Sequence, residues 1–170
     1  MTSPTDHSSE NVSSRKSSAE AASSAEQPQQ FNKVTLDRVV KAMKDLGIEL
    51  DTSNSDQRPV GFANINGIAM LFAAMPSVLL VRGDVATSSP SLDLEPSYFL
   101  AANQLNAQSE LAKVCIMDKT QTLTIRAEAE TMSAAGLSDI QLTNVLKHSV
   151  DTVLGLQEAF GKIHATIKAD

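Results

Sequence analysis

The stretch from Val60 to Val85 alternates short apolar runs with two tight-turn signals, and it predicts the centre of a β-sheet. Asn66-Gly67 lies between two apolar runs, and these two residue types best tolerate the positive φ angles of a type I′ hairpin turn. Met75-Pro76-Ser77 provides a second turn, because proline fixes φ and donates no hydrogen bond to a strand ladder. We therefore expect three short antiparallel strands, which helices on either side must cover.

Helical periodicity precedes and follows this stretch. From Leu36 to Leu46 apolar residues recur every three or four positions, with Thr35 placed as an N-cap and Gly47 as the stop. Residues 96–107 predict a second helix, because Pro96 suits a first turn. We expect its last asparagines, Asn103 and Asn106, to end the helix and bind the following strand; a polar recognition pair is the alternative.

The last helix has the strongest signal in the chain. Ser138 and Gln141 form a capping box, and apolar residues then recur every three or four positions as far as Ile167. Such a helix is roughly 40 Å long, whereas about 20–25 Å crosses a five-stranded sheet. The end from Phe160 onward therefore either overhangs the sheet as an association surface or packs on its own domain.

Two further strands are expected, at residues 113–117 and 122–130. In the second strand, Leu123, Ile125, Ala127 and Ala129 alternate with polar residues, so that one face packs and the other meets water. Residues 51–58 and 87–96 are interpreted as a polar loop and a surface connection. The predicted fold is α+β: a two-layer antiparallel sheet of about five strands with helices on one face, in the order α-β-β-β-α-β-β-α.

Composition sets the domain limits and excludes some function classes. Nine of the first thirty residues are serine, so residues 1–30 are predicted to be a disordered tail, solubilising or phosphorylated, and residues 31–170 the domain. A hydrophobic content of 42% is ordinary for a globular chain, and a net charge of −6 without a basic stripe disfavours nucleic-acid binding. With no signal peptide and no apolar run long enough to span a membrane, we expect a cytoplasmic protein.

No constellation of catalytic or metal-binding residues is recognisable. The single cysteine, Cys115, lies in a predicted strand and is interpreted as a small buried residue, with a reactive thiol as the alternative. His7 lies in the tail, and His148 and His164 are too far apart along the last helix to share a ligand. We therefore expect no enzyme activity, no cofactor and no metal.

A family resemblance covers residues 34–160. The segment ANQLNAQSELAKVCIMDKTQTLTIRAEAE, followed by GLSDIQLTNVLKHSV, resembles the YbjN family of bacterial proteins, whose domain is similar in fold to type III secretion chaperones. The family is described as candidate regulators of sensory or stress responses without an established enzymatic activity. The resemblance implies a chaperone-like domain that binds protein segments or assembles with itself. These matches are diffuse patterns rather than reactive residues.

The function that we expect is a protein-interaction or regulatory module, acting as a homodimer or on a protein partner. We base this expectation on apolar surface of the sheet and the last helix that the domain itself does not cover. The candidate surface residues are Phe62, Leu71, Val78, Leu80, Leu156, Phe160 and Ile163. The alternative is a small apolar ligand held in a pocket between sheet and helices. Its lining would include Met43, Met70, Met75 and Met117, although methionine more often fills a core.

Overall fold

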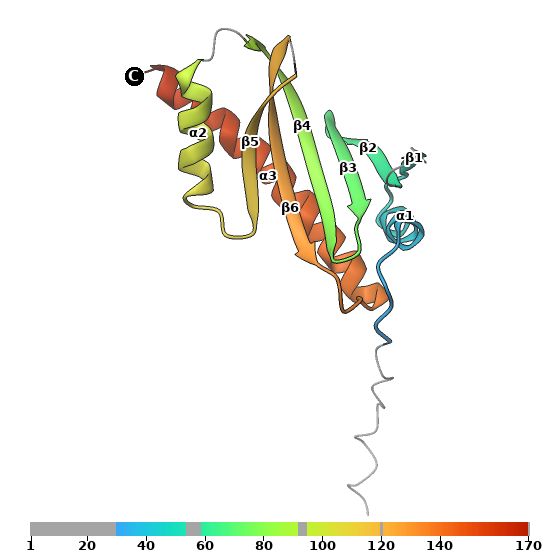
Figure 1. Cartoon of the computed structure of the whole chain (residues 1–170). Helices are drawn as coiled ribbons and strands as arrows, with labels where there is room; N and C mark the ends of the chain where they lie inside the picture. Colours follow the sequence, from blue (N-terminus) through green and yellow to red (C-terminus); the bar gives the residue numbers. More distant parts are fainter. Residues whose placement is uncertain (1–29, 54–58, 92–94, 120, 170) are drawn as a thin grey trace, which may run out of the picture.

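The chain forms one open antiparallel sheet with helices on one face (Figure 1). The computed structural model describes residues 30–53, 59–91, 95–119 and 121–169; the predicted tail at residues 1–30 lies almost wholly outside the described residues. The elements are α1 (Leu36–Asp45), β1 (Asp51–Ser53), β2 (Val60–Ile65), β3 (Ile68–Ala74), β4 (Val78–Pro90), α2 (Pro96–Asn106), β5 (Ala112–Asp118), β6 (Thr122–Met132) and α3 (Asp139–Ala169).

The strand order is β1-β2-β3-β4-β6-β5, and every neighbouring pair is antiparallel. The predicted α+β architecture is confirmed, but the sheet has six strands rather than about five. The additional strand is β1, which falls in the stretch that we interpreted as a polar loop. Its three exposed residues carry no apolar pattern, and pairing with residues 60–62 of β2 is what makes them a strand.

Local signals in the sequence mark the observed turns and caps. Asn66 and Gly67 have φ angles of 53° and 82°, so both central residues of the β2–β3 turn lie in the left-handed region. The capping box of α3 is complete: the Ser138 backbone N–H donates to Gln141 Oε1 at 3.0 Å, and the Gln141 N–H donates to Ser138 Oγ at 3.2 Å. Thr35 caps α1 by accepting from the Arg38 N–H.

Two strands are longer than their patterns predicted. β4 continues to Pro90, through residues that we assigned to a surface connection, because it remains paired with β6 after a register shift between Ala86 and Pro90. β6 continues to Met132, opposite Val78. Residues 92–94 of the expected connection lie outside the described residues. Long-range pairing extended both strands beyond their local apolar pattern.

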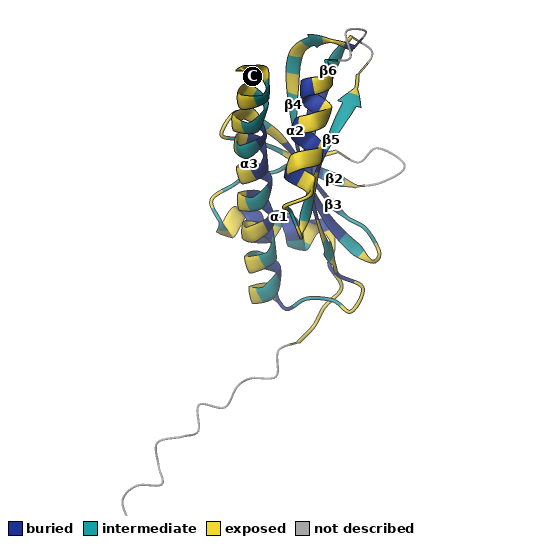
Figure 2. Ribbon diagram, turned by 90° about the vertical axis from the view of Figure 1, so that its left-hand side faces the viewer, coloured by how far each residue is buried: buried dark blue, intermediate teal, exposed yellow. Residues whose placement is uncertain are grey.

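The core lies between the sheet and the helices (Figure 2). Its largest fully buried side chains include Phe72, Met43, Leu146 and Phe160. α3 crosses β4 so closely that a Cβ at Gly83 would stand 2.7 Å from Val153 Cγ1. Glycine at this position therefore sets the distance between α3 and the sheet.

The second half of α3 packs on its own domain. Its Phe160 is 1% exposed, and His164 stacks on Tyr98 of α2 with ring centroids 4.1 Å apart. Lys168 also reaches Glu95, just before α2, at 2.9 Å. α2 lies against this part of α3 and β5, so the alternative of packing on the domain holds and the helix end is not a free overhang.

Candidate interaction face

The sheet surface opposite the helices, here called the open face, has no helix or strand packed over it in the part of the chain that the structure describes. α3 runs behind the strands in the view of Figure 1, and α1 and α2 both pack against α3. The strand register puts Phe62, Leu71, Arg82, Glu128 and Lys113 side by side in one row from β2 to β5. This row is apolar at one end and charged at the other.

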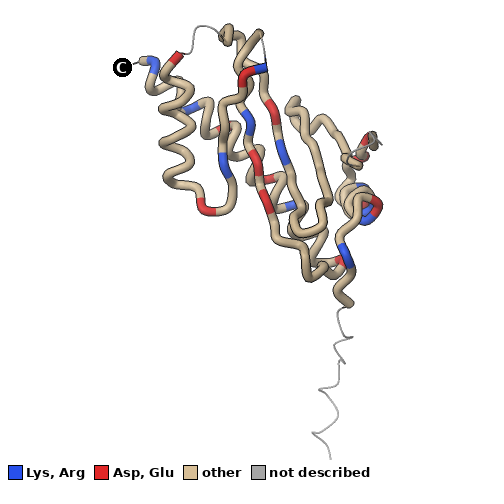
Figure 3. The backbone as a smooth tube through the Cα atoms, viewed as in Figure 1, with Lys and Arg blue, Asp and Glu red and all other residues tan. Residues whose placement is uncertain are grey.

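The apolar end of the row belongs to a larger patch, here called the apolar corner. Its members come from β2, β3, β4 and the end of β6, and they are Val60, Phe62, Leu71, Val78, Leu80 and Met132. Phe62 is 40% exposed and Met132 is 74% exposed. Leu80, which we expected at the surface, is buried, because its neighbours on this face enclose it. Figure 3 shows that β2 and β3 carry no charged residue. The corner therefore presents apolar surface to water with no ion pair within it.

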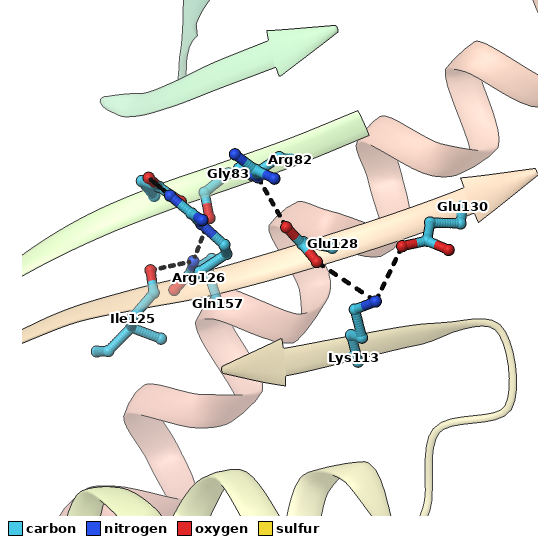
Figure 4. A network of polar contacts seen from close by, with 9 residues as sticks. Arg82, Gly83, Lys113, Ile125, Arg126, Glu128, Glu130 and Gln157 are labelled. Carbon is cyan, nitrogen blue, oxygen red and sulfur yellow. Dashed lines mark hydrogen bonds and ion pairs between the residues drawn. The ribbon is translucent and has the colours of Figure 1, made fainter. Parts of the chain in front are cut away.

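The other part of the open face, here called the charged half, is a network of ion pairs across β4, β6 and β5 (Figure 4). Glu128 accepts from Arg82 Nε at 2.7 Å and lies 3.5 Å from Lys113 Nζ, which also donates to Glu130 at 2.9 Å. In the next row, Arg126 binds both oxygens of Asp84, at 2.8 and 2.7 Å. Three cations and three anions balance one another here.

These contacts alter the protonation of the network. Partial burial alone would raise the pKa of Asp84, but the hydrogen bond and charge of Arg126, helped by Lys119 and Arg82, outweigh burial and lower it. The hydrogen bond to Glu130 raises the pKa of Lys113. Each partner therefore favours the charged form of the other, and the charged half satisfies its charges without any outside partner.

Four of the seven predicted surface residues meet in the apolar corner: Phe62, Leu71, Val78 and Leu80. The other three lie on the far side of the sheet in α3. Leu156 and Phe160 are buried there, and Ile163 is half-buried against the core. The periodicity of the helix marked a covered face correctly, but α2 and the sheet, rather than a partner, cover it. These three residues are therefore no part of the open face.

The structure corrects two expectations about β5 and β6. Cys115 is half-buried on the open face, opposite Arg126, because Val114 and Ile116 take the positions that face the helices. On β6, Thr124 and Glu128 are buried rather than water-facing, because neighbouring strands on both sides enclose them. The seven predicted residues did not include Val60 and Met132 of the apolar corner or any residue of the charged half. The sequence did hold a signal for Arg82 and Asp84. β4 and β6 each carry one cation and one anion two positions apart, as cross-strand ion pairs require.

A polar cluster between α2 and α3 brings a serine and a histidine together. Ser97 Oγ lies 2.9 Å from His164 Nε2 and donates to Glu95 Oε1 at 2.9 Å. Hydrogen bonds from Lys168 and Ser97 lower the pKa of Glu95. The carboxylate thus binds the serine rather than orienting the imidazole, unlike the order of a hydrolase triad. This cluster ties α3 to α2.

The remaining candidate residues do not form a site. His148 is exposed on α3, and no group of three or more His, Cys, Asp or Glu side chains in the described ranges is arranged to hold a metal ion. The four methionines proposed to line a pocket are divided: Met43 and Met70 are core residues, whereas Met75 and Met117 are half-buried elsewhere. Asn106 does bind the next strand, exchanging two 2.8 Å hydrogen bonds with the backbone of Val114.

None of the described helices combines the length and the apolar character that a bilayer crossing requires. No family model matches the sequence, and no curated protein matches it. Among solved structures, the chain is similar to YbjN of E. coli, described as "a putative transcription regulator", with a TM-score of 0.55 and 14% identity. The match covers 82% of this chain and 96% of that chain. At this identity the likeness shows the fold alone.

Proposed function

We propose that the chain is a non-enzymatic protein-interaction module. Its contact surface is the open face, and the apolar corner makes the main contact with the partner. The observation that carries this proposal is the contrast within that face. The charged half is internally neutralised, whereas Phe62 and Met132 hold apolar surface in water beside it. Exposed apolar clusters rimmed by polar residues are typical of protein contact sites.

The fold likeness to YbjN supports a regulatory setting, since that protein is described as a candidate transcription regulator. We extend this to a bacterial stress or sensory role in the cytoplasm, with chaperone-like binding of a protein segment or a homodimer as the mode of action. The net charge of −6 and the balanced charges of the open face favour a protein partner over nucleic acid.

The test is a comparison of two phenylalanines with matched exposure. Phe62 in the apolar corner is 40% exposed, and Phe99 on α2 is 44% exposed. We expect Phe62→Glu to abolish both self-association in sedimentation experiments and the partners recovered by affinity capture from the source organism. Phe99→Glu should leave both unchanged, because α2, which packs against α3 and the edge strand β5, is no part of the open face.

Two results would overturn the proposal. Loss of association in Phe99→Glu alone would move the contact to α2, where Leu100 is exposed as well. A wild-type chain that stays monomeric and recovers no more partners than Phe62→Glu would remove the interaction role. Both variants change exposed side chains, and near-equal melting temperatures will verify that each one folds.

A further inference from the structure

We propose that a groove on the helix side of the sheet binds a single aliphatic chain that carries an uncharged or cationic head group. The groove has a volume of about 620 Å³, within the range of about 300–1,000 Å³ that ligand sites occupy. Ile68, Val85 and Ile125 of the sheet form one wall, and Leu154 and Phe160 of α3 belong to the other. Ile68, Val85 and Leu154 are half-buried and form the accessible apolar lining, whereas Ile125 and Phe160 are buried beneath it.

Two glycines of α3, Gly155 and Gly161, also line the groove. Glycine inside a helix costs about 1 kcal/mol relative to alanine, so a structural reason for each is expected. Neither has a positive φ angle, and a Cβ built on either one meets no atom within 4 Å. The chain's own packing therefore does not require them. Because they have no side chains, they leave space beside the groove that an inserted aliphatic chain can occupy.

The charged side chains that line the groove select the head group. Asp151 and Glu158 are the charged residues on its wall, while their partners Lys147 and Lys162, at 2.7 and 2.6 Å, are not among the lining residues. The lining thus offers an incoming head group two ion-paired carboxylates and no cation that would bind an anionic group, which favours a neutral or cationic one. The ligand class is therefore a long-chain alcohol, ester or amine rather than a fatty acid.

The test uses dodecyl chains with three head groups: dodecyltrimethylammonium, dodecyl maltoside and dodecanoate, each below its critical micelle concentration. In full-length protein with ¹³C-labelled isoleucine methyl groups, we expect the first two to shift the Ile68 and Ile125 signals saturably. Dodecanoate should bind about tenfold more weakly, equivalent to about 1.4 kcal/mol. Absence of saturable shifts with all three probes would overturn the site, and dodecanoate binding as tightly as the others would overturn the head-group assignment.

Gly161→Leu fills the groove from within. Because nothing lies within 4 Å of the new Cβ and leucine favours the helix, this variant should fold with unchanged or higher stability. We expect it to weaken probe binding at least about tenfold. Asn144→Leu, which adds the same side chain at an exposed α3 position outside the groove, should bind as wild type. Equal binding by wild type and Gly161→Leu would contradict the proposal; the open face, on the other side of the sheet, is unaffected by either result.

Discussion

The two faces of this sheet are stabilised in different ways. On the helix side, apolar side chains are removed from water by α1, α2 and α3, which makes burial the main source of stability. On the open face, cross-strand ion pairs hold the charged half, and the apolar corner is partly exposed. The comparison teaches that a sheet can keep one face uncovered when part of that face satisfies its own polar groups, so that surface remains for a partner.

The largest expected difference between the faces comes from two phenylalanines. Phe160→Ala empties a fully buried site and should lower the free energy of unfolding by about 3–5 kcal/mol. Phe62→Ala, on the open face, should cost less than about 1 kcal/mol. Urea denaturation of both variants measures the contrast. Equal losses would mean that the open face is covered in solution.

Breaking an ion pair of the charged half should give the second-largest loss of stability. Arg126→Ala removes both hydrogen bonds to Asp84, in a pair whose side chains are only 12% and 26% exposed. The expected loss is about 2 kcal/mol, between the values for surface and buried pairs. Lys147→Ala breaks an exposed pair within α3 and should cost at most about 0.5 kcal/mol. If thermal denaturation gives similar losses for both, the network adds nothing to the stability of the open face.

The outer edge of the sheet provides a third comparison, between two asparagines of α2. Asn106→Ala removes two hydrogen bonds from the Val114 backbone of edge strand β5 and should cost about 1–2 kcal/mol. It also exposes strand edge, so we expect concentration-dependent association by light scattering. Asn103→Ala, at an exposed position of the same helix, is the control. A monomeric, fully stable Asn106→Ala chain would show that this edge needs no protection.

Low pH should reduce the stability that the ion pairs of the open face provide, by a smaller amount than the substitutions above. The pKa of Asp84 is lowered in the folded chain, so its stabilising effect is present above the unfolded pKa of about 4 and is lost as pH falls through the folded value. Between pH 5 and 2, wild type should lose on the order of 1 kcal/mol more stability than Asp84→Asn. Identical curves for wild type and Asp84→Asn would contradict the assigned role of this pair.

Features of the fold that depend on neighbouring residues could be predicted from the sequence. Asn66-Gly67 and the Ser138–Gln141 capping box mark their turn and helix start because glycine, asparagine and cap side chains act within a few residues. β1 and the end of β4 could not be predicted, because pairing with distant strands creates them. The alternation of apolar and polar residues in β6 identified the two faces of the strand correctly. It did not reveal that the neighbouring strands bury part of the polar face.

The candidate site was predicted in part for the same reason. Phe62, Leu71, Val78 and Leu80 belong to one meander, whose register follows from its two turns. The contact between Arg82 and Glu128 joins residues 46 positions apart and depends on β4 lying beside β6, which no local pattern specifies. Phe160 has the spacing of an association surface, yet only the position of α2 reveals that the domain itself covers it.

Photo-crosslinking in living cells tests the central claim most directly. Benzoylphenylalanine replaces Phe62 in one strain and Phe99 in another, which is a conservative change at two phenylalanines of similar exposure. If the open face is the contact surface, ultraviolet light will give discrete protein adducts from position 62 and none from position 99. Adducts from position 99 alone, or from neither position, would contradict the claim.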